Sequence, residues 1–155
     1  MSKSKQFRIY ADTSVFGGLF DEEFSAHSKL FFQAVQDGKF KLVTSAVVSK
    51  ELEAAPMEVI QFFRKIVSGC EIAEVTDEVL TLQGSYLKQG IVTQKYYDDA
   101  LHVALATVWG CECIVSWNFK HIVNVDKIRG YNSVNIKLGY TTIDIRSPRE
   151  LMKYE

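Results

Sequence analysis

Asp12 is the residue of this sequence best placed to do chemistry. It ends a run of strand-forming residues that begins at Phe7, and two hydroxyl residues, Thr13 and Ser14, follow it directly. An ionised carboxylate is costly to bury, so we expect Asp12 to lie where the strand leaves its sheet. In open α/β sheets, that edge is where ligands bind.

Two further acids are candidates to join Asp12. Glu51 lies on the same, otherwise apolar face of a predicted helix as Val47 and Val48. Asp99 directly precedes the core-facing apolar residues of a later predicted helix. Carboxylates of this kind are the ligands that Mg²⁺ and Mn²⁺ prefer. Without a cation, clustered carboxylates raise one another's pKa. The spacing leaves open the ordinary alternative, in which Asp12 is a turn former or helix cap and Glu51 a solvated acid.

Composition narrows the class of protein. A chain of 155 residues predicts a single domain spanning 1–155, and 47% apolar with 24% charged residues is ordinary for a globular protein. The formal charge of -1 excludes a polycation, so binding of nucleic acid would need a local patch or a metal. The polar start and the lack of a long apolar run predict a soluble, cytoplasmic protein that makes no membrane contact.

Cysteine usage predicts no zinc site. Cys70, Cys111 and Cys113 are an odd number of thiols, and none of them stands in a C-x-x-C or histidine-rich setting. We therefore expect buried thiols.

Strand-like and helix-like segments alternate along the chain. This order predicts an α/β fold with a mainly parallel central sheet of about five strands. The expected strands are 7–12, 40–44, 71–75, 112–117 and 140–145. An acidic and then amphipathic stretch covers 15–38, and the expected helices are 46–54, 56–68, 79–88, 96–109, 119–128 and a C-terminal helix at 148–155, with an irregular loop at 130–139.

Several helix starts carry a capping residue. Ser45, Thr76 and Asn118 each precede a predicted helix and have side chains that accept hydrogen bonds from helix N–H groups. Ser147 and Glu150 have the spacing of a capping box around Pro148.

Four segments together resemble PIN-domain proteins, and among them the VapC-like toxins of bacterial toxin–antitoxin pairs. The segments are Tyr-Ala-Asp-Thr-Ser at 10–14, the residues 45–52, and the stretches 97–106 and 114–122, in the order and near the spacing of that family. The most specific part is the Asp-Ala-Leu-His-x-Ala-x-Ala helix together with the Ser-Trp-Asn-Phe-Lys-His-Ile turn. The resemblance covers about 7–145 as the core.

The resemblance implies a three-layer α/β/α fold and an Mg²⁺- or Mn²⁺-dependent endoribonuclease. By motif, Asp12 would be the central metal ligand, with Glu51 and Asp99 as the other two acids. Thr13 or Ser14 would form hydrogen bonds near the metal or the phosphate. The implied partners are an RNA substrate, a small antitoxin protein and a second copy of the chain.

One position departs from the family pattern. Many members carry a fourth acid after the next strand, where this chain has Asn118, and this leaves open whether one or two metal ions bind. An amide oxygen can ligate a cation but adds no charge. Lys120 and His121 follow at the same sheet edge and are candidates to contact RNA phosphates, the alternative being a solvated helix face. His102 has no partner at a recognisable spacing and receives no role.

Three other classes remain as alternatives. A phosphotransferase of the haloacid dehalogenase type would need a second aspartate two residues after Asp12, where Ser14 stands. A receiver domain would need an acidic pair before a mid-chain aspartate, which the sequence lacks. A catalytically inactive PIN-like module that binds RNA or a protein partner is the serious rival, because of Asn118.

Overall fold

A five-stranded sheet forms the centre of the computed structural model, which describes residues 6–152. Its strand order is β3-β2-β1-β4-β5, and every neighbouring pair is parallel. The strands are β1 (Phe7–Ala11), β2 (Phe40–Ser45), β3 (Glu71–Ala73), β4 (Cys113–Val115) and β5 (Asp144–Arg146). The predicted α/β class with a parallel sheet is therefore confirmed.

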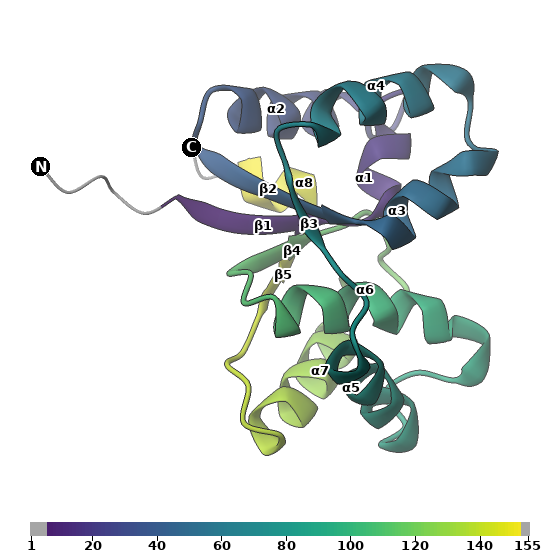
Figure 1. Ribbon diagram of the computed structural model, residues 1–155, viewed down its shortest axis with the longest axis vertical. Helices are drawn as coiled ribbons and strands as arrows, with labels where there is room; N and C mark the ends of the chain where they lie inside the picture. Colours follow the sequence, from purple (N-terminus) through teal and green to yellow (C-terminus); the bar gives the residue numbers. More distant parts are fainter. Residues whose placement is uncertain (1–5, 153–155) are drawn as a thin grey trace, which may run out of the picture.

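Helices cover both faces of the sheet and make three layers (Figure 1). One layer contains α1 (Thr13–Gly18), α2 (Ser25–Gln36), α3 (Ala46–Glu51), α4 (Met57–Val67) and α8 (Pro148–Met152). The opposite layer contains α5 (Asp77–Lys88), α6 (Tyr97–Val108) and α7 (Val125–Lys137). Short 3₁₀ turns, η1 (Leu52–Ala54) and η2 (Gln94–Tyr96), extend α3 and precede α6.

The order of the strands creates a crevice beside β1. The chain builds β1, β2 and β3 outward in one direction, then returns to place β4 on the other side of β1. Connections leave in opposite directions from the carboxyl ends of β1 and β4, which is the kind of switch point where open α/β sheets bind ligands. Asp12 and Ser116 directly follow these two strands, so both lie at the crevice.

Most of the predicted capping residues are confirmed. Ser45 accepts a hydrogen bond from Val48 N at the start of α3, and Thr76 caps α5. Ser147 and Glu150 exchange two hydrogen bonds of 3.1 Å, which is the predicted capping box at α8. The end of the predicted C-terminal helix, 153–155, lies outside the described residues.

The predictions for 119–124 and 130–137 are wrong. The segment expected to be a helix turns irregularly up to Asn124, and the expected loop is the body of α7, which Asn124 caps. The polar residues that suggested a loop are used inside the fold, because Asn132 binds both Ile143 backbone groups and Asn135 is buried against Tyr86. The fifth strand, expected at 140–145, is shorter and spans Asp144–Arg146.

Trp117 and the cysteines are structural. The Trp117 ring stacks on Phe24 at 4.3 Å, and its Nε1 donates to Ser28 Oγ at 2.9 Å. Cys111 and Cys113 are buried free thiols as predicted, whereas the free thiol Cys70 is half-buried. Burial raises the pKa of Cys111 to about 12. Within residues 6–152, no helix is both long and apolar enough to cross a bilayer.

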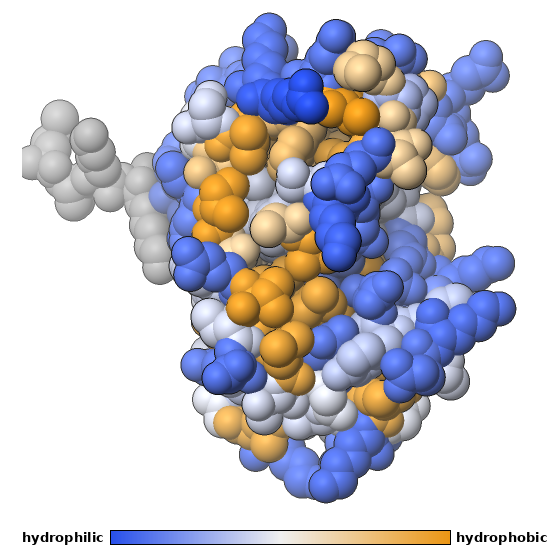
Figure 2. Space-filling view, turned by 45° about the vertical axis from the view of Figure 1, so that its right-hand side comes forward, coloured by the Kyte–Doolittle hydropathy of each residue, from blue (hydrophilic) through white to orange (hydrophobic). Residues whose placement is uncertain are grey.

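Apolar side chains also gather on one outer face, among charged ones (Figure 2). The large exposed apolar side chains include Met57 on α4, Ile72 on β3 and Val75 after β3. A groove of about 660 Å³ lies between α3, α4 and β3. Such surfaces on soluble domains often mark contacts with other molecules.

Adjacent glycines in α1 should respond in opposite ways to alanine. A Cβ on Gly18 would lie 2.8 Å from both Ser28 Oγ and Trp117 Nε1, whereas one on exposed Gly17 would meet no atom within 4 Å. We expect Gly18→Ala to lower the free energy of unfolding by about 1–3 kcal/mol and Gly17→Ala to raise it by about 0.5–1 kcal/mol. Urea unfolding of both variants tests this, and equal effects at the two positions would contradict it.

Candidate active site

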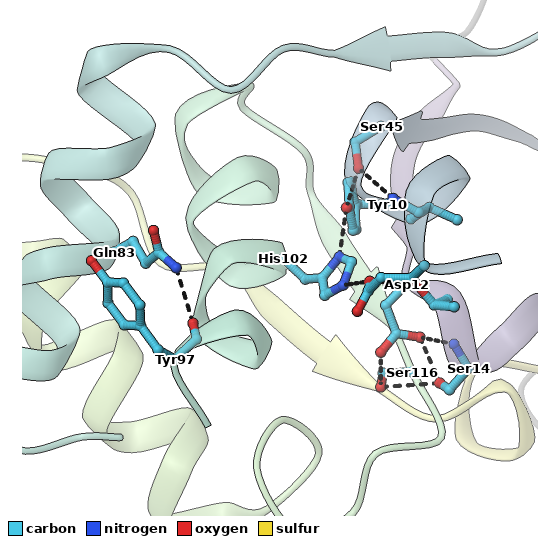
Figure 3. A network of polar contacts seen from close by, with 11 residues as sticks. Tyr10, Asp12, Ser14, Ser45, Gln83, Tyr97, His102 and Ser116 are labelled. Carbon is cyan, nitrogen blue, oxygen red and sulfur yellow. Dashed lines mark hydrogen bonds and ion pairs between the residues drawn. The ribbon is translucent and has the colours of Figure 1, made fainter. Parts of the chain in front are cut away.

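Asp12 is buried at the carboxyl ends of the neighbouring strands β1 and β4. It caps α1, with Oδ1 accepting from Ser14 N at 3.1 Å and from Ser14 Oγ at 2.6 Å. Its Oδ2 accepts from Ser116 Oγ, which follows β4, at 2.6 Å (Figure 3). Only 4% of the residue is exposed. Both carboxylate oxygens are thus held by neutral donors, Ser14 from the start of α1 and Ser116 from the residue after β4.

Burial raises the pKa of Asp12 above its usual value. The nearby His102 and the hydroxyls of Ser116 and Ser14 oppose this change, while the negative charge of Glu51 adds to it. The net direction is upward because the hydroxyls do not fully replace the lost water. Asp12 is therefore a carboxylate whose charge a cation would stabilise.

Glu51 reaches the same edge from the last residue of α3. Its Oε1 accepts from Thr13 Oγ1 at 2.7 Å and from His102 Nε2 at 2.6 Å. Desolvation alone would raise the pKa of Glu51, but the contacts with His102 and Thr13 outweigh it and lower the pKa. Its side chain is 39% exposed, so this carboxylate is the one most open to an incoming molecule.

Asp99 stands in the first turn of α6 and pairs with Asn118. Half-burial raises the pKa of Asp99, and a side-chain hydrogen bond with Asn118 works in the opposite direction. The amide oxygen of Asn118 accepts from His121 N at 3.0 Å. Asn118 therefore connects Asp99 to the turn after β4.

The structure brings the three predicted acids to one edge of the sheet. The charge of Glu51 raises the pKa values of both Asp12 and Asp99, so all three groups lie within electrostatic range. Each carboxylate nevertheless has its own hydrogen-bond partners. In the described part of the chain, no group of three or more His, Cys, Asp or Glu side chains is arranged so that it could hold a metal ion.

His102 is the site residue that the sequence did not assign. It lies one turn after Asp99 on α6 and is buried between Glu51 and Tyr10. Its ring points toward Tyr10, with Asp12 and its two serine partners beyond (Figure 3). The i, i+3 spacing from Asp99 places both side chains on neighbouring positions of one helix face, and this was the signal available in the sequence.

Two solved structures share this architecture. A VapBC2 structure from Rickettsia felis, bound to a DNA fragment from its promoter, matches at a TM-score of 0.56 and 14% identity, covering 90% of this chain and 98% of the other. VapC20 of Mycobacterium tuberculosis, described as a toxin that cleaves the sarcin–ricin loop, matches at a TM-score of 0.56 and 14% identity, covering 88% and 98%. This chain has a VapC-like PIN fold. No protein-family model and no curated protein matches the sequence.

In this VapC-like fold, the residues expected to contact phosphates lie in two settings. Lys120 is exposed after β4. The His121 ring stacks on Tyr96 with centroids 3.6 Å apart, and Lys95 Nζ lies 5.4 Å from the centre of the Tyr96 ring. His121 also interacts electrostatically with Asp99. A half-exposed surface of Lys95, Tyr96 and His121 thus borders the acidic site.

Asp99→Asn should stabilise the metal-free protein at neutral pH. Because the folded-state pKa of Asp99 is raised above 3.8, its ionised form is less favourable in the folded than in the unfolded protein. This unfavourable contribution is absent below the unfolded pKa and fully present above the folded pKa. Asparagine removes the charge and keeps an oxygen to accept from Asn118.

The measurement is urea unfolding of wild type and Asp99→Asn in EDTA, between about pH 3 and pH 7. We expect the variant to be the more stable protein at the upper end of this range and the difference to shrink as pH falls. An advantage that grows toward low pH would contradict the raised pKa of Asp99.

Proposed function

We propose that this protein is an endoribonuclease that uses Mg²⁺ or Mn²⁺ to hydrolyse phosphodiester bonds in RNA. The observation that carries the proposal is the convergence of Asp12, Glu51 and Asp99 at the switch point of a VapC-like fold. The raised pKa values of Asp12 and Asp99 support it, because they show negative charge that the surrounding protein leaves partly uncompensated. The VapC20 likeness supports an RNA substrate.

The three acids suit a hard divalent cation, because they are negatively charged and offer oxygen ligands. All three acids offer carboxylate oxygens, and the described residues near them provide neutral hydroxyl and amide donors and histidine. As the side chains stand, they do not converge closely enough to hold an ion. We propose that Asp12 and Asp99 would hold the cation, with Glu51 as the third acid.

Each acid has a different part in the proposed reaction. Asp12 and Asp99 would hold the cation, which when bound supplies charge neutralisation at the scissile phosphate and activation of water. Glu51 would serve as the third acid at the cation or, instead, accept a proton from the attacking water, because both of its hydrogen bonds to described residues use Oε1 and its side chain is 39% exposed. Thr13 and Ser14 would keep the carboxylates of Glu51 and Asp12 in place.

The RNA would be drawn to the site by local contacts. A chain with a formal charge of -1 has no general attraction for a polyanion. Lys120 and the surface of Lys95, Tyr96 and His121 are proposed to bind phosphates beside Asp99, and the half-exposed Tyr96 to stack on a base.

The proposed cellular role is that of a toxin in a toxin–antitoxin pair. The VapBC2 likeness supports a small antitoxin as partner, and we propose that the chain also forms a homodimer. Exposed Met57, Ile72 and Val75 support protein partners in general.

One observation favours a second candidate, an inactive module that binds RNA or a partner. Asn118 stands where the resemblance implies a fourth acid, and its amide oxygen is already bound to His121 N. The site then has three carboxylates rather than four.

Cleavage of a mixed single-stranded RNA pool separates the two candidates. We expect Mn²⁺-dependent cutting that Asp12→Asn and Asp99→Asn each reduce by about 100-fold or more, because each removes a charged ligand. Asp98→Asn is the matched control, since Asp98 is the exposed neighbour of Asp99 on the same helix. Folded wild type that does not cut, or cutting that survives in both site variants, would disprove the nuclease proposal.

A further inference from the structure

His102 is fixed at both ring nitrogens inside the site. Its Nε2 lies 2.6 Å from Glu51 Oε1, and its Nδ1 lies 2.7 Å from the Tyr10 hydroxyl. The side chain is 4% exposed, whereas that of Glu51 is 39% exposed. An imidazole bonded at both nitrogens and enclosed by protein cannot rotate freely, so it presents Nε2 to Glu51 in one direction.

The hydrogen bonds form a chain that runs from Glu51 into the interior of the protein. Ionised Glu51 can only accept, so Nε2 of His102 must carry the hydrogen. The Tyr10 hydroxyl connects His102 Nδ1 to Ser45 Oγ, 2.8 Å away. Ser45 in turn accepts from Val48 N at 3.3 Å as the cap of α3.

This chain ties together the two ends of α3. Ser45 precedes the first residue of the helix, and Glu51 is the last residue. Between Ser45 and Glu51, the hydrogen bonds pass through Tyr10 of β1 and His102 of α6. The chain therefore fixes both ends of α3 to these two elements. Thr13 completes the arrangement by binding the same oxygen of Glu51 from the end of β1.

We propose that His102 is a positioning residue that holds the Glu51 carboxylate at the sheet edge shared with Asp12 and Asp99, where Glu51 would act as the third acid for a divalent cation. Tyr10 and Ser45 hold the imidazole in turn. The inference rests on the proposed nuclease function and adds to it a buried support for the acid of α3.

A purely structural histidine would be expected to behave differently. Apolar residues such as Val103 and Leu105 on the same helix are fully buried, so a leucine at 102 would suit the general packing of α6. What leucine cannot supply is an N–H aimed at Glu51. The effect of His102→Leu on cation binding, rather than on stability, therefore distinguishes the two roles.

The test is Mn²⁺ binding to the full-length protein by isothermal titration calorimetry, alongside kcat and KM for RNA cleavage. Supporting groups behind metal ligands commonly contribute about 10–100-fold in affinity or activity. We expect His102→Leu to weaken Mn²⁺ binding by about 10-fold or more and to lower kcat with little change in KM. His102→Gln should recover part of both losses, because its amide N–H can take the place of Nε2–H.

Two tyrosines provide a matched control. Tyr10→Phe and Tyr86→Phe each remove one hydroxyl from a fully buried ring, and Tyr86 donates to Asn135 away from the site. Both should lower the melting temperature. Only Tyr10→Phe should also weaken Mn²⁺ binding, because it leaves His102 Nδ1 without its partner.

The outcomes separate this inference from the nuclease proposal. Wild-type Mn²⁺ affinity and kcat in folded His102→Leu and in Tyr10→Phe, with loss in Asp99→Asn, would overturn the positioning role alone. Failure of wild type itself to bind Mn²⁺ would overturn both. If His102→Leu does not fold, His102→Gln and the tyrosine pair decide, and equal Mn²⁺ affinities in Tyr10→Phe and Tyr86→Phe would count against the inference.

Discussion

The burial of one carboxylate at the switch point is the constraint on which the site depends. Parallel pairing of β1 with β4 places Asp12 next to Ser116, and the start of α1 adds the backbone and hydroxyl of Ser14. These neutral donors make burial of Asp12 possible, but they do not neutralise it, and its pKa stays raised. The fold thus keeps a negative charge available at the carboxyl end of its central strand. Functional sites commonly keep such a buried charged group although it lowers the stability of the folded protein.

Glu51 and His102 show how the two helical layers are joined at this edge. Glu51 comes from α3 on one face of the sheet, and His102 comes from α6 on the other. Glu51 Oε1 and His102 Nε2 lie 2.6 Å apart near the end of β1. The buried Tyr10 hydroxyl of β1 binds the other ring nitrogen of His102. Among residues 6–152, no lysine or arginine side chain forms a hydrogen bond to Asp12, Glu51 or Asp99. A fixed cationic side chain would already satisfy the carboxylates, so a site built from hydroxyl, amide and imidazole groups is compatible with the proposed cation.

Local signals in the sequence were enough for most of the fold and for the acids. Alternating strand and helix patterns predicted the parallel sheet, and Ser45 and Ser147 marked true helix starts because capping involves residues only three positions apart. The same reasoning failed for α7, where Asn132 and Asn135 read as loop residues although tertiary contacts with Ile143 and Tyr86 bury their amides. His102 was missed for a related reason. Its hydrogen-bond partners stand 51 and 92 residues away, so the only local signal was its i, i+3 spacing from Asp99.

Asn118 has a physical explanation that does not require loss of function. An aspartate at this position would face Asp99 and raise its pKa further, because like charges at close range disfavour ionisation. The asparagine instead donates to Asp99 and lowers its pKa, while its oxygen accepts from His121 N and fixes the turn after β4. An asparagine here removes one carboxylate and keeps Asp99 ionised at lower pH than an aspartate would. Under the proposed function, three carboxylates would suit one divalent cation better than two, because two ions would bring four positive charges to the site.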